Sequence, residues 1–116
     1  MTKIRGATEF EQAVIEHIIK KEAPKYSGHI KSLLVDRREY TGVGSFLYLK
    51  YAEKPSLSEF ENKSIGQDTY ADIEGLKNGA GFILYIDEGL ISMLESFSHG
   101  PERWPEYIAN FKIKDL

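Results

Sequence analysis

The chain has 116 residues, no cysteine and a formal net charge of −3. This length fits one domain, residues 1–116, with one core, and the absence of cysteine excludes thiol nucleophiles, Cys₄ zinc sites and a disulfide framework. The missing disulfides favour a reducing, cytoplasmic compartment. No apolar run reaches the roughly 20 residues of a membrane helix, and neither a membrane segment nor a signal peptide is expected.

The charge is distributed unevenly along the chain. Residues 1–50 contain nine Lys/Arg and six Asp/Glu, whereas residues 51–116 contain six and twelve, so the two parts have net charges of +3 and −6. An acidic half repels phosphate groups, which argues against nucleic-acid binding, and it suits a basic protein partner. The same charge is also common on soluble domains, so charge alone does not choose a function.

The first predicted element is a helix over residues 9–22. Thr8 and Glu11 have the spacing of a capping box, in which each side chain satisfies a backbone amide of the other residue. Pro24 ends the helical pattern. Apolar residues recur at helical spacing and predict packing on a sheet: Phe10, Ala13, Val14, Ile15, Ile18 and Ile19.

The rest of the chain reads as strands. Alternating apolar residues predict strands after a loop at 25–28, interrupted by a charged turn at 36–39 and by a long loop at 53–69 with a short edge strand near 64–66. The strands are expected within residues 29–36, 40–52, 70–76, 80–86, 90–97 and 107–114. One helix followed by strands indicates the α+β class, with the helix on a mostly antiparallel sheet of five to seven strands.

Residues 80–97 have the pattern of a β-hairpin. Asp87, Glu88 and Gly89 separate two apolar runs, and Gly89 can adopt the positive φ of a tight turn. Both runs are so apolar that we expect the hairpin at the centre of the sheet, with neither face open to water.

Two motifs invite chemical interpretations that their spacing does not support. The segment 42–44 reads Gly-Val-Gly, but Leu47 occupies the place of the third glycine of a dinucleotide-binding loop. The remaining interpretation is that these glycines allow another backbone segment to come close at the start of a strand. The histidines, at 17, 29 and 99, lack the spacing of common metal motifs. No metal and no cofactor is predicted.

Glu95 is a carboxylate within an otherwise apolar strand. Such a group needs a partner or a water-filled cleft. One interpretation is a structural ion pair with Arg37, Arg38 or Arg103. The other is a small-molecule or small hydrolytic site, because a histidine near a carboxylate can perform acid–base chemistry. That site would comprise Tyr85, Glu95, His99 and Arg103.

Trp104 lies between Pro101 and Pro105 in an irregular segment. Tryptophan offers a large rigid area with a polar tip, which is favoured at interfaces. We therefore expect Trp104 to face a partner or to act as a lid.

Four short motifs carry a family resemblance: GVGSF at 42–46, GAGFILYIDEG at 79–89, LESFSHG at 94–100 and WP at 104–105. On these motifs the chain resembles a family of small bacterial proteins, some of which look like immunity proteins of polymorphic toxin systems, including contact-dependent growth inhibition. The resemblance implies an inhibitor that binds one cognate toxin domain, often a nuclease, and it transfers no catalytic residue.

The leading hypothesis is a small cytoplasmic protein that binds and neutralises a basic toxin domain, since the sequence contains no recognisable catalytic constellation. The small-molecule or hydrolytic site is the alternative, and a homodimer through an exposed strand edge is a third possibility. The residues expected to contact the partner are Glu53, Glu59, Glu61, Asp68, Asp72, Asp87, Glu88, Glu102 and Trp104.

Overall fold

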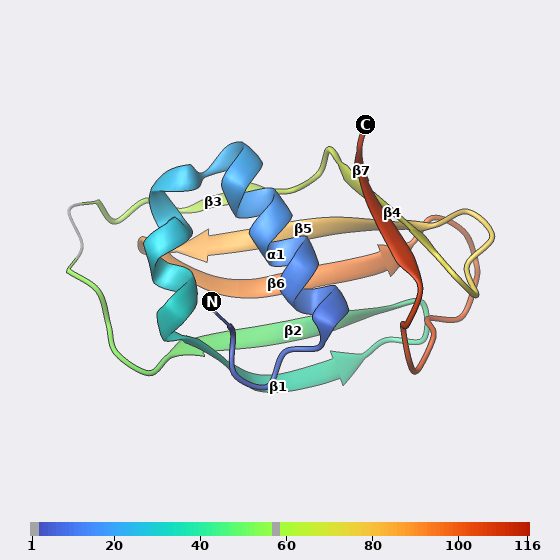
Figure 1. Cartoon of the computed structure of the whole chain (residues 1–116), viewed down its shortest axis with the longest axis horizontal. Coiled ribbons are helices and arrows are strands. Elements are labelled where there is room, and N and C mark those ends of the chain that lie inside the picture. Colours follow the sequence, from blue (N-terminus) through green and yellow to red (C-terminus); the bar gives the residue numbers. More distant parts are fainter. Residues whose placement is uncertain (1–2, 57–58) are drawn as a thin grey trace.

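The structure, a computed structural model, describes residues 3–56 and 59–116. A helical layer packs on one face of a seven-stranded sheet, which confirms the predicted α+β class (Figure 1). The strands are β1 (Leu33–Tyr40), β2 (Gly44–Tyr51), β3 (Lys63–Ile65), β4 (Thr69–Ile73), β5 (Ala80–Asp87), β6 (Leu90–Ser98) and β7 (Phe111–Asp115). The strand order is β1-β2-β6-β5-β4-β7, with β3 also paired to β5, and all these pairs are antiparallel.

The helical layer begins with α1 (Glu9–Glu22), which has the predicted bounds. Its capping box is formed: the backbone N of Glu11 donates to Thr8 Oγ1 at 3.1 Å, and the backbone N of Thr8 donates to Glu11 Oε1 at 2.9 Å. The predicted loop at 25–28 is instead part of a 3₁₀ helix, η1 (Pro24–Ser32), which buries Tyr26. Proline is compatible with the first helical position because that position needs no amide donor.

The charged segment at 36–39 was predicted as a turn but belongs to β1. Arg37 and Arg38 pair with residues of β2, and a register shift between Val35 and Arg37 accommodates the extra residue Asp36. β1 lies at the sheet edge, where charged side chains reach water. The chain turns later, at 41–43, where Gly42 has a φ of +90°.

The predicted edge strand near 64–66 is confirmed as β3, and the last strand is shorter than expected. The central hairpin is also confirmed, because β5 and β6 are the middle strands of the order. Glu88 and Gly89 form its turn with φ values of 51° and 77°. Positive φ at both central residues is typical of a type I′ turn, whose twist matches that of the flanking strands.

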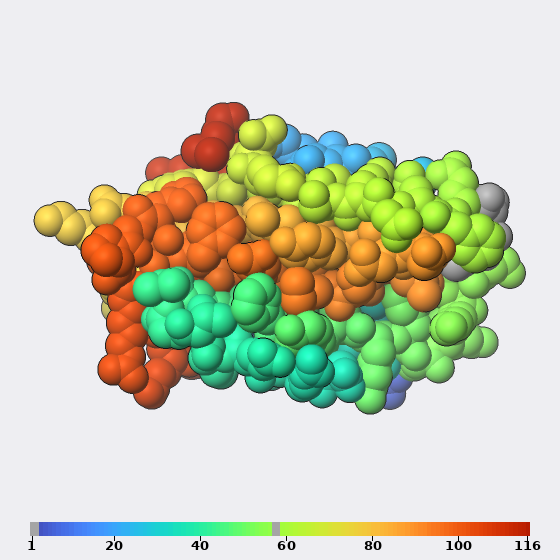
Figure 2. Space-filling model, turned by 180° about the vertical axis from the view of Figure 1, so that it is seen from behind, coloured from blue at the N-terminus to red at the C-terminus, as the bar shows by residue number. Residues whose placement is uncertain are grey.

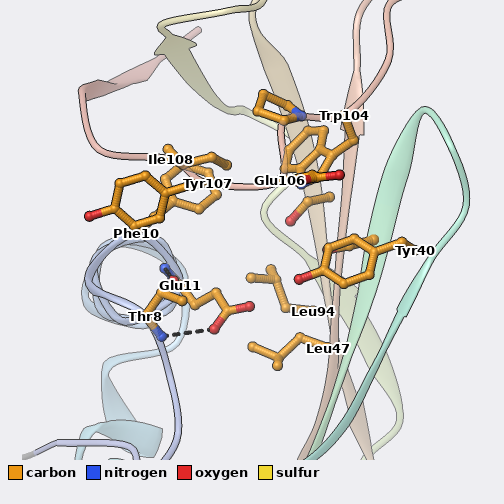
Figure 3. Close-up of a pocket in the computed structure, with 13 residues that line it drawn as sticks. Thr8, Phe10, Glu11, Tyr40, Leu47, Leu94, Trp104, Glu106, Tyr107 and Ile108 are labelled. Carbon is orange, nitrogen blue, oxygen red and sulfur yellow. Dashed lines mark hydrogen bonds between the residues drawn. The ribbon is translucent and has the colours of Figure 1, made fainter.

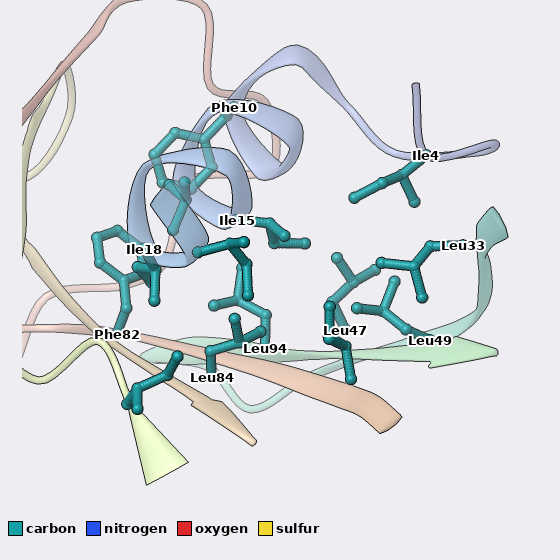
Figure 4. Close-up of a cluster of buried hydrophobic side chains, with 14 of the residues drawn as sticks. Ile4, Phe10, Ile15, Ile18, Leu33, Leu47, Leu49, Phe82, Leu84 and Leu94 are labelled. Atoms are coloured by element: carbon teal, nitrogen blue, oxygen red, sulfur yellow. The ribbon is translucent and has the colours of Figure 1, made fainter. Parts of the chain in front are cut away.

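The core lies between α1 and the sheet. Figure 4 shows Phe10, Ile15 and Ile18 of α1 above Leu47, Leu84 and Leu94 of the central strands. These strand residues are at most 1% exposed. The stripe read from the sequence is thus the buried face of α1.

The helices cover only one face of the sheet. The expectation that neither face of the hairpin meets water is therefore wrong. Figure 2 shows the opposite face, where atoms of β5 and β6 lie at the surface of the molecule. We call this the open face.

Candidate functional site

The open face carries a continuous set of apolar and aromatic side chains on its central strands. Register places Met93 between Tyr48 and Tyr85, and Glu95 between Phe46 and Ile83. We call the whole set the open-face patch; all its members are half-buried: Phe46, Tyr48, Tyr70, Ile83, Tyr85, Met93, Glu95 and Phe97.

This composition is unusual for an exposed sheet face. An antiparallel sheet with one solvated face normally alternates apolar residues toward the core with polar residues toward water. Here Glu95 is the only charged member of the patch. Contiguous apolar surface of this kind is typical of an interaction site.

Glu95 lies at the middle of the patch and is held by Tyr85. Tyr85 Oη donates to Glu95 Oε1 at 2.9 Å. The two residues are diagonal neighbours on the same face of β5 and β6. Burial, followed by this hydrogen bond, raises the pKa of Tyr85. The tyrosine therefore remains a donor at physiological pH.

The three arginines proposed as ion-pair partners of Glu95 are engaged elsewhere. Arg37 stacks over the Tyr48 ring at 3.9 Å, Arg38 binds Glu11, and Arg103 lies beside Trp104. Within residues 3–56 and 59–116, Glu95 has no ion pair. The structural ion-pair interpretation is wrong, and the carboxylate charge is uncompensated.

The four residues of the alternative ligand site do not come together. Tyr85 and Glu95 are in contact, but His99 lies four residues further along the chain, about 13 Å away at the rise of an extended strand. There the His99 ring stacks on Tyr70, with centroids 5.5 Å apart. Arg103 lines a separate hollow.

The acidic contact residues are scattered over several places, and many are already neutralised. Lys25 Nζ lies 2.6 Å from Glu59 Oε2 and 2.9 Å from Glu61 Oε1. Hydrogen bonds from Tyr26 and Lys25 lower the pKa of Glu61 to about 2. These carboxylates hold the segment before β3 against η1.

Other members of the acidic set also have structural partners. Asp72 pairs with Lys114, and the Glu102 carboxylate accepts the backbone N–H groups of Lys77 and Asn78 at 2.7 and 3.1 Å. Asp87 accepts from Ser92 Oγ. Three members have exposed carboxylates that make no hydrogen bond or ion pair among the described residues: Glu53, Asp68 and Glu88.

Trp104 does not face outward, so the expectation of a partner-facing side chain is wrong, while the alternative role as a lid stays a prediction. It is 7% exposed and packs on Phe10, with ring centroids 6.4 Å apart. Its backbone N donates to Gly42 O at 2.7 Å, which ties the segment after β6 to the β1–β2 turn. Contacts between segments far apart in the sequence thus bury the ring.

A second feature, which sequence reasoning missed, is a cleft beneath Trp104 that we call the Trp104 cleft. It has a volume of about 60 Å³ and lies between the start of α1 and the sheet (Figure 3). A more open hollow of about 360 Å³ adjoins it along Tyr40, Trp104 and Glu106. Residues from four separate segments line the cleft, and for that reason no local sequence pattern predicts it.

Ser45 and Ser96 line the Trp104 cleft on the sheet side and are cross-strand partners. Glu11 lines it near α1, where its carboxylate binds Arg38. Figure 3 shows the Tyr40 ring across the cleft from Glu11. The cleft combines apolar walls with a few polar groups, as small-molecule sites do.

No group of three or more His, Asp or Glu side chains in the described part of the chain is arranged to hold a metal ion. None of the helices in that part is long and apolar enough to cross a membrane. A scan against protein-family models, and searches of curated proteins and of solved structures, found no match to this chain.

Proposed function

We propose that this chain is a protein-binding module whose partner docks on the open face. The observation that carries this proposal is the open-face patch, an apolar and aromatic surface on the central strands that no element of the described chain covers. Half-buried aromatic side chains on a sheet are already restricted, so the patch itself loses little side-chain entropy when a partner binds it.

Glu95 defines the chemistry of the partner. Its uncompensated carboxylate lies among Phe46, Ile83 and Tyr85, so docking an apolar surface over it would bury an unpaired charge. A partner that places an arginine here satisfies the carboxylate and stacks its guanidinium on the neighbouring rings. A basic partner also approaches an acidic chain faster.

The concrete form of this proposal is an immunity protein that neutralises a toxin domain. Three features support it: the small acidic chain, the resemblance of its motifs to a family of small bacterial proteins of which some look like immunity proteins, and the open-face patch with the carboxylate of Glu95 at its middle. Nuclease toxin domains are expected to be basic because they bind phosphates.

The test uses affinity capture from the native host with matched variants. Met93→Lys and Ile83→Lys place a charge in the patch, whereas Lys20→Glu changes an exposed charge on α1, away from it. We expect one basic protein to bind wild type and Lys20→Glu with 1:1 stoichiometry in calorimetry, and to bind the patch variants at least about tenfold more weakly. The captured protein should be toxic when expressed alone.

Two results would overturn the proposal. Equal binding to the patch variants would place the interface elsewhere. A wild-type chain that sediments as a dimer, and becomes monomeric in Met93→Lys, would make a second copy of the chain the occupant of the open face. Circular dichroism of each variant confirms that it remains folded.

The Trp104 cleft favours a second candidate function, small-molecule binding. It replaces the cluster at Tyr85, Glu95, His99 and Arg103 as the place where a ligand would fit, because only Tyr85 and Glu95 of that cluster are in contact.

A further inference from the structure

Two serine hydroxyls open onto the Trp104 cleft without a hydrogen-bond partner among the described residues. Ser45 is 8% exposed and Ser96 is 4% exposed. They face each other on β2 and β6, where the Cβ atoms of cross-strand partners are about 5 Å apart. Among the described residues, Thr69 Oγ1 is the only buried side-chain polar atom without a partner, so the two serine oxygens are reachable from the cleft and can hold one polar group between them.

The charges that line the cleft are balanced. The Glu11 carboxylate accepts from Arg38 Nε at 2.8 Å, from Arg38 Nη2 at 2.6 Å and from the Thr8 backbone N at 2.9 Å. Arg103 and Glu106, of opposite charge, both line the outer hollow. A ligand with one net charge would be attracted to one of these two side chains and repelled by the other, whereas a neutral hydroxyl can donate to and accept from both serines.

Size and shape define the rest of the ligand. The inner cleft has a cavity volume of about 60 Å³, several times the roughly 10–15 Å³ that one water needs, so it admits one small group such as a hydroxymethyl. The outer hollow of about 360 Å³ has the size of a small-ligand pocket and presents Tyr40 and Trp104. Aromatic rings offer flat apolar surfaces to the C–H faces of a saturated ring.

We propose that the Trp104 cleft binds a small neutral polyhydroxylated molecule of the pyranose-sugar type, with one hydroxyl inserted between Ser45 and Ser96. The body of the ligand lies in the outer hollow against Tyr40 and Trp104. Its outer hydroxyls reach Arg103 and Glu106. This site lies on the helix-covered side of the sheet and does not depend on partner binding at the open face.

The experiment is a ¹H–¹⁵N NMR titration of the full chain with named probes. The neutral probes are methyl glucopyranoside, methyl galactopyranoside, N-acetylglucosamine and myo-inositol; glucuronate and glucosamine are the charged counterparts. We expect at least one neutral probe to give saturable shifts at Ser45, Ser96 and the Trp104 indole, at concentrations up to about 50 mM. The charged counterparts should bind at least about tenfold more weakly.

Variants separate the proposed site from a nonspecific effect. Ser45→Ala and Ser96→Ala should each weaken binding about tenfold without lowering the melting temperature, because they remove unpaired hydroxyls. Ser92→Ala, on the same strand outside the cleft, should bind like wild type.

Three outcomes overturn the proposal. The absence of saturable shifts with every neutral probe means that the serines hold ordered water only. Equal or tighter binding of a charged counterpart contradicts the charge argument. Unchanged binding in both Ser45→Ala and Ser96→Ala places the ligand elsewhere.

Discussion

The Arg38 guanidinium donates hydrogen bonds to both carboxylate oxygens of Glu11, with Nε 2.8 Å from Oε2 and Nη2 2.6 Å from Oε1. The same Oε1 accepts the backbone N–H of Thr8, so one side chain both caps α1 and ties it to β1. Bidentate, charge-assisted hydrogen bonds of this kind are stronger than hydrogen bonds between neutral groups. Glu11 is accordingly buried although it is charged.

Arg38→Met should lower the free energy of unfolding by about 2 kcal/mol, because it leaves a buried carboxylate without its cation. Arg37→Met is the matched control, since Arg37 is exposed and its ion pair with Glu39 spans 3.4 Å; it should cost less than about 1 kcal/mol. Urea unfolding measures both. Equal losses would show that the Glu11 pair has no special role.

Glu95→Leu should stabilise the isolated protein by about 1 kcal/mol while it abolishes binding of the proposed partner. Replacing a half-buried, uncompensated carboxylate by an apolar side chain removes a desolvation cost. Residues at binding sites often lower the stability of the free protein in this way while they serve binding. Glu39→Leu, at an exposed position of β1, should change stability by less than about 0.5 kcal/mol.

Thermal and urea unfolding of both variants decide the point. A loss of stability in Glu95→Leu larger than the loss in Glu39→Leu would make Glu95 a structural residue rather than a binding residue.

Stability should fall on mild acidification because of His29. The Tyr51 hydroxyl accepts from the backbone N of Ile91 at 2.8 Å and lies 2.9 Å from His29 Nδ1, an arrangement that suits donation of its proton to a neutral imidazole. Burial lowers the pKa of His29. The unfolded chain, with a histidine pKa of about 6.5, binds more protons than the folded chain below that pH.

The free energy of unfolding should therefore decrease as the pH falls below about 6.5 and should be insensitive to His29 above about pH 7.5. Urea unfolding of wild type and His29→Gln, compared across this range, isolates the contribution. A difference between the two proteins that is independent of pH would contradict the assignment.

Gly44 marks the close backbone approach predicted for the Gly-Val-Gly segment. A Cβ at this position would lie 2.1 Å from the carbonyl oxygen of Ser96, so the β2–β6 pair would have to separate. Gly44→Ala should cost about 1 to 3 kcal/mol. Gly28→Ala is the control, because its Cβ would meet nothing within 4 Å, and denaturant unfolding should show little change.

Local patterns determined a large part of this fold. The bounds of α1 follow from its capping box and apolar stripe, since helix contacts join residues three and four apart. The β5–β6 hairpin follows from two apolar runs around a turn that tolerates positive φ at Gly89. These elements were predictable because their determinants lie within a few residues of one another.

Long-range packing decided the remaining elements. The charged residues at 36–39 form a strand because β2 supplies hydrogen-bond partners, and Trp104 is buried because its segment folds back onto Gly42 and Phe10. Hydrogen bonding to another strand and exclusion of water depend on which segments meet, which neighbouring residues do not encode.

The two candidate sites divide in the same way. The sequence identified Glu95 as an unusual charge in an apolar strand, but only the structure gave it Tyr85 as a partner and left its charge uncompensated. The Trp104 cleft had no local trace, because Ser45 and Ser96 become neighbours only when β2 pairs with β6. Composition and periodicity thus determine which faces are apolar, whereas strand register decides which side chains share a site.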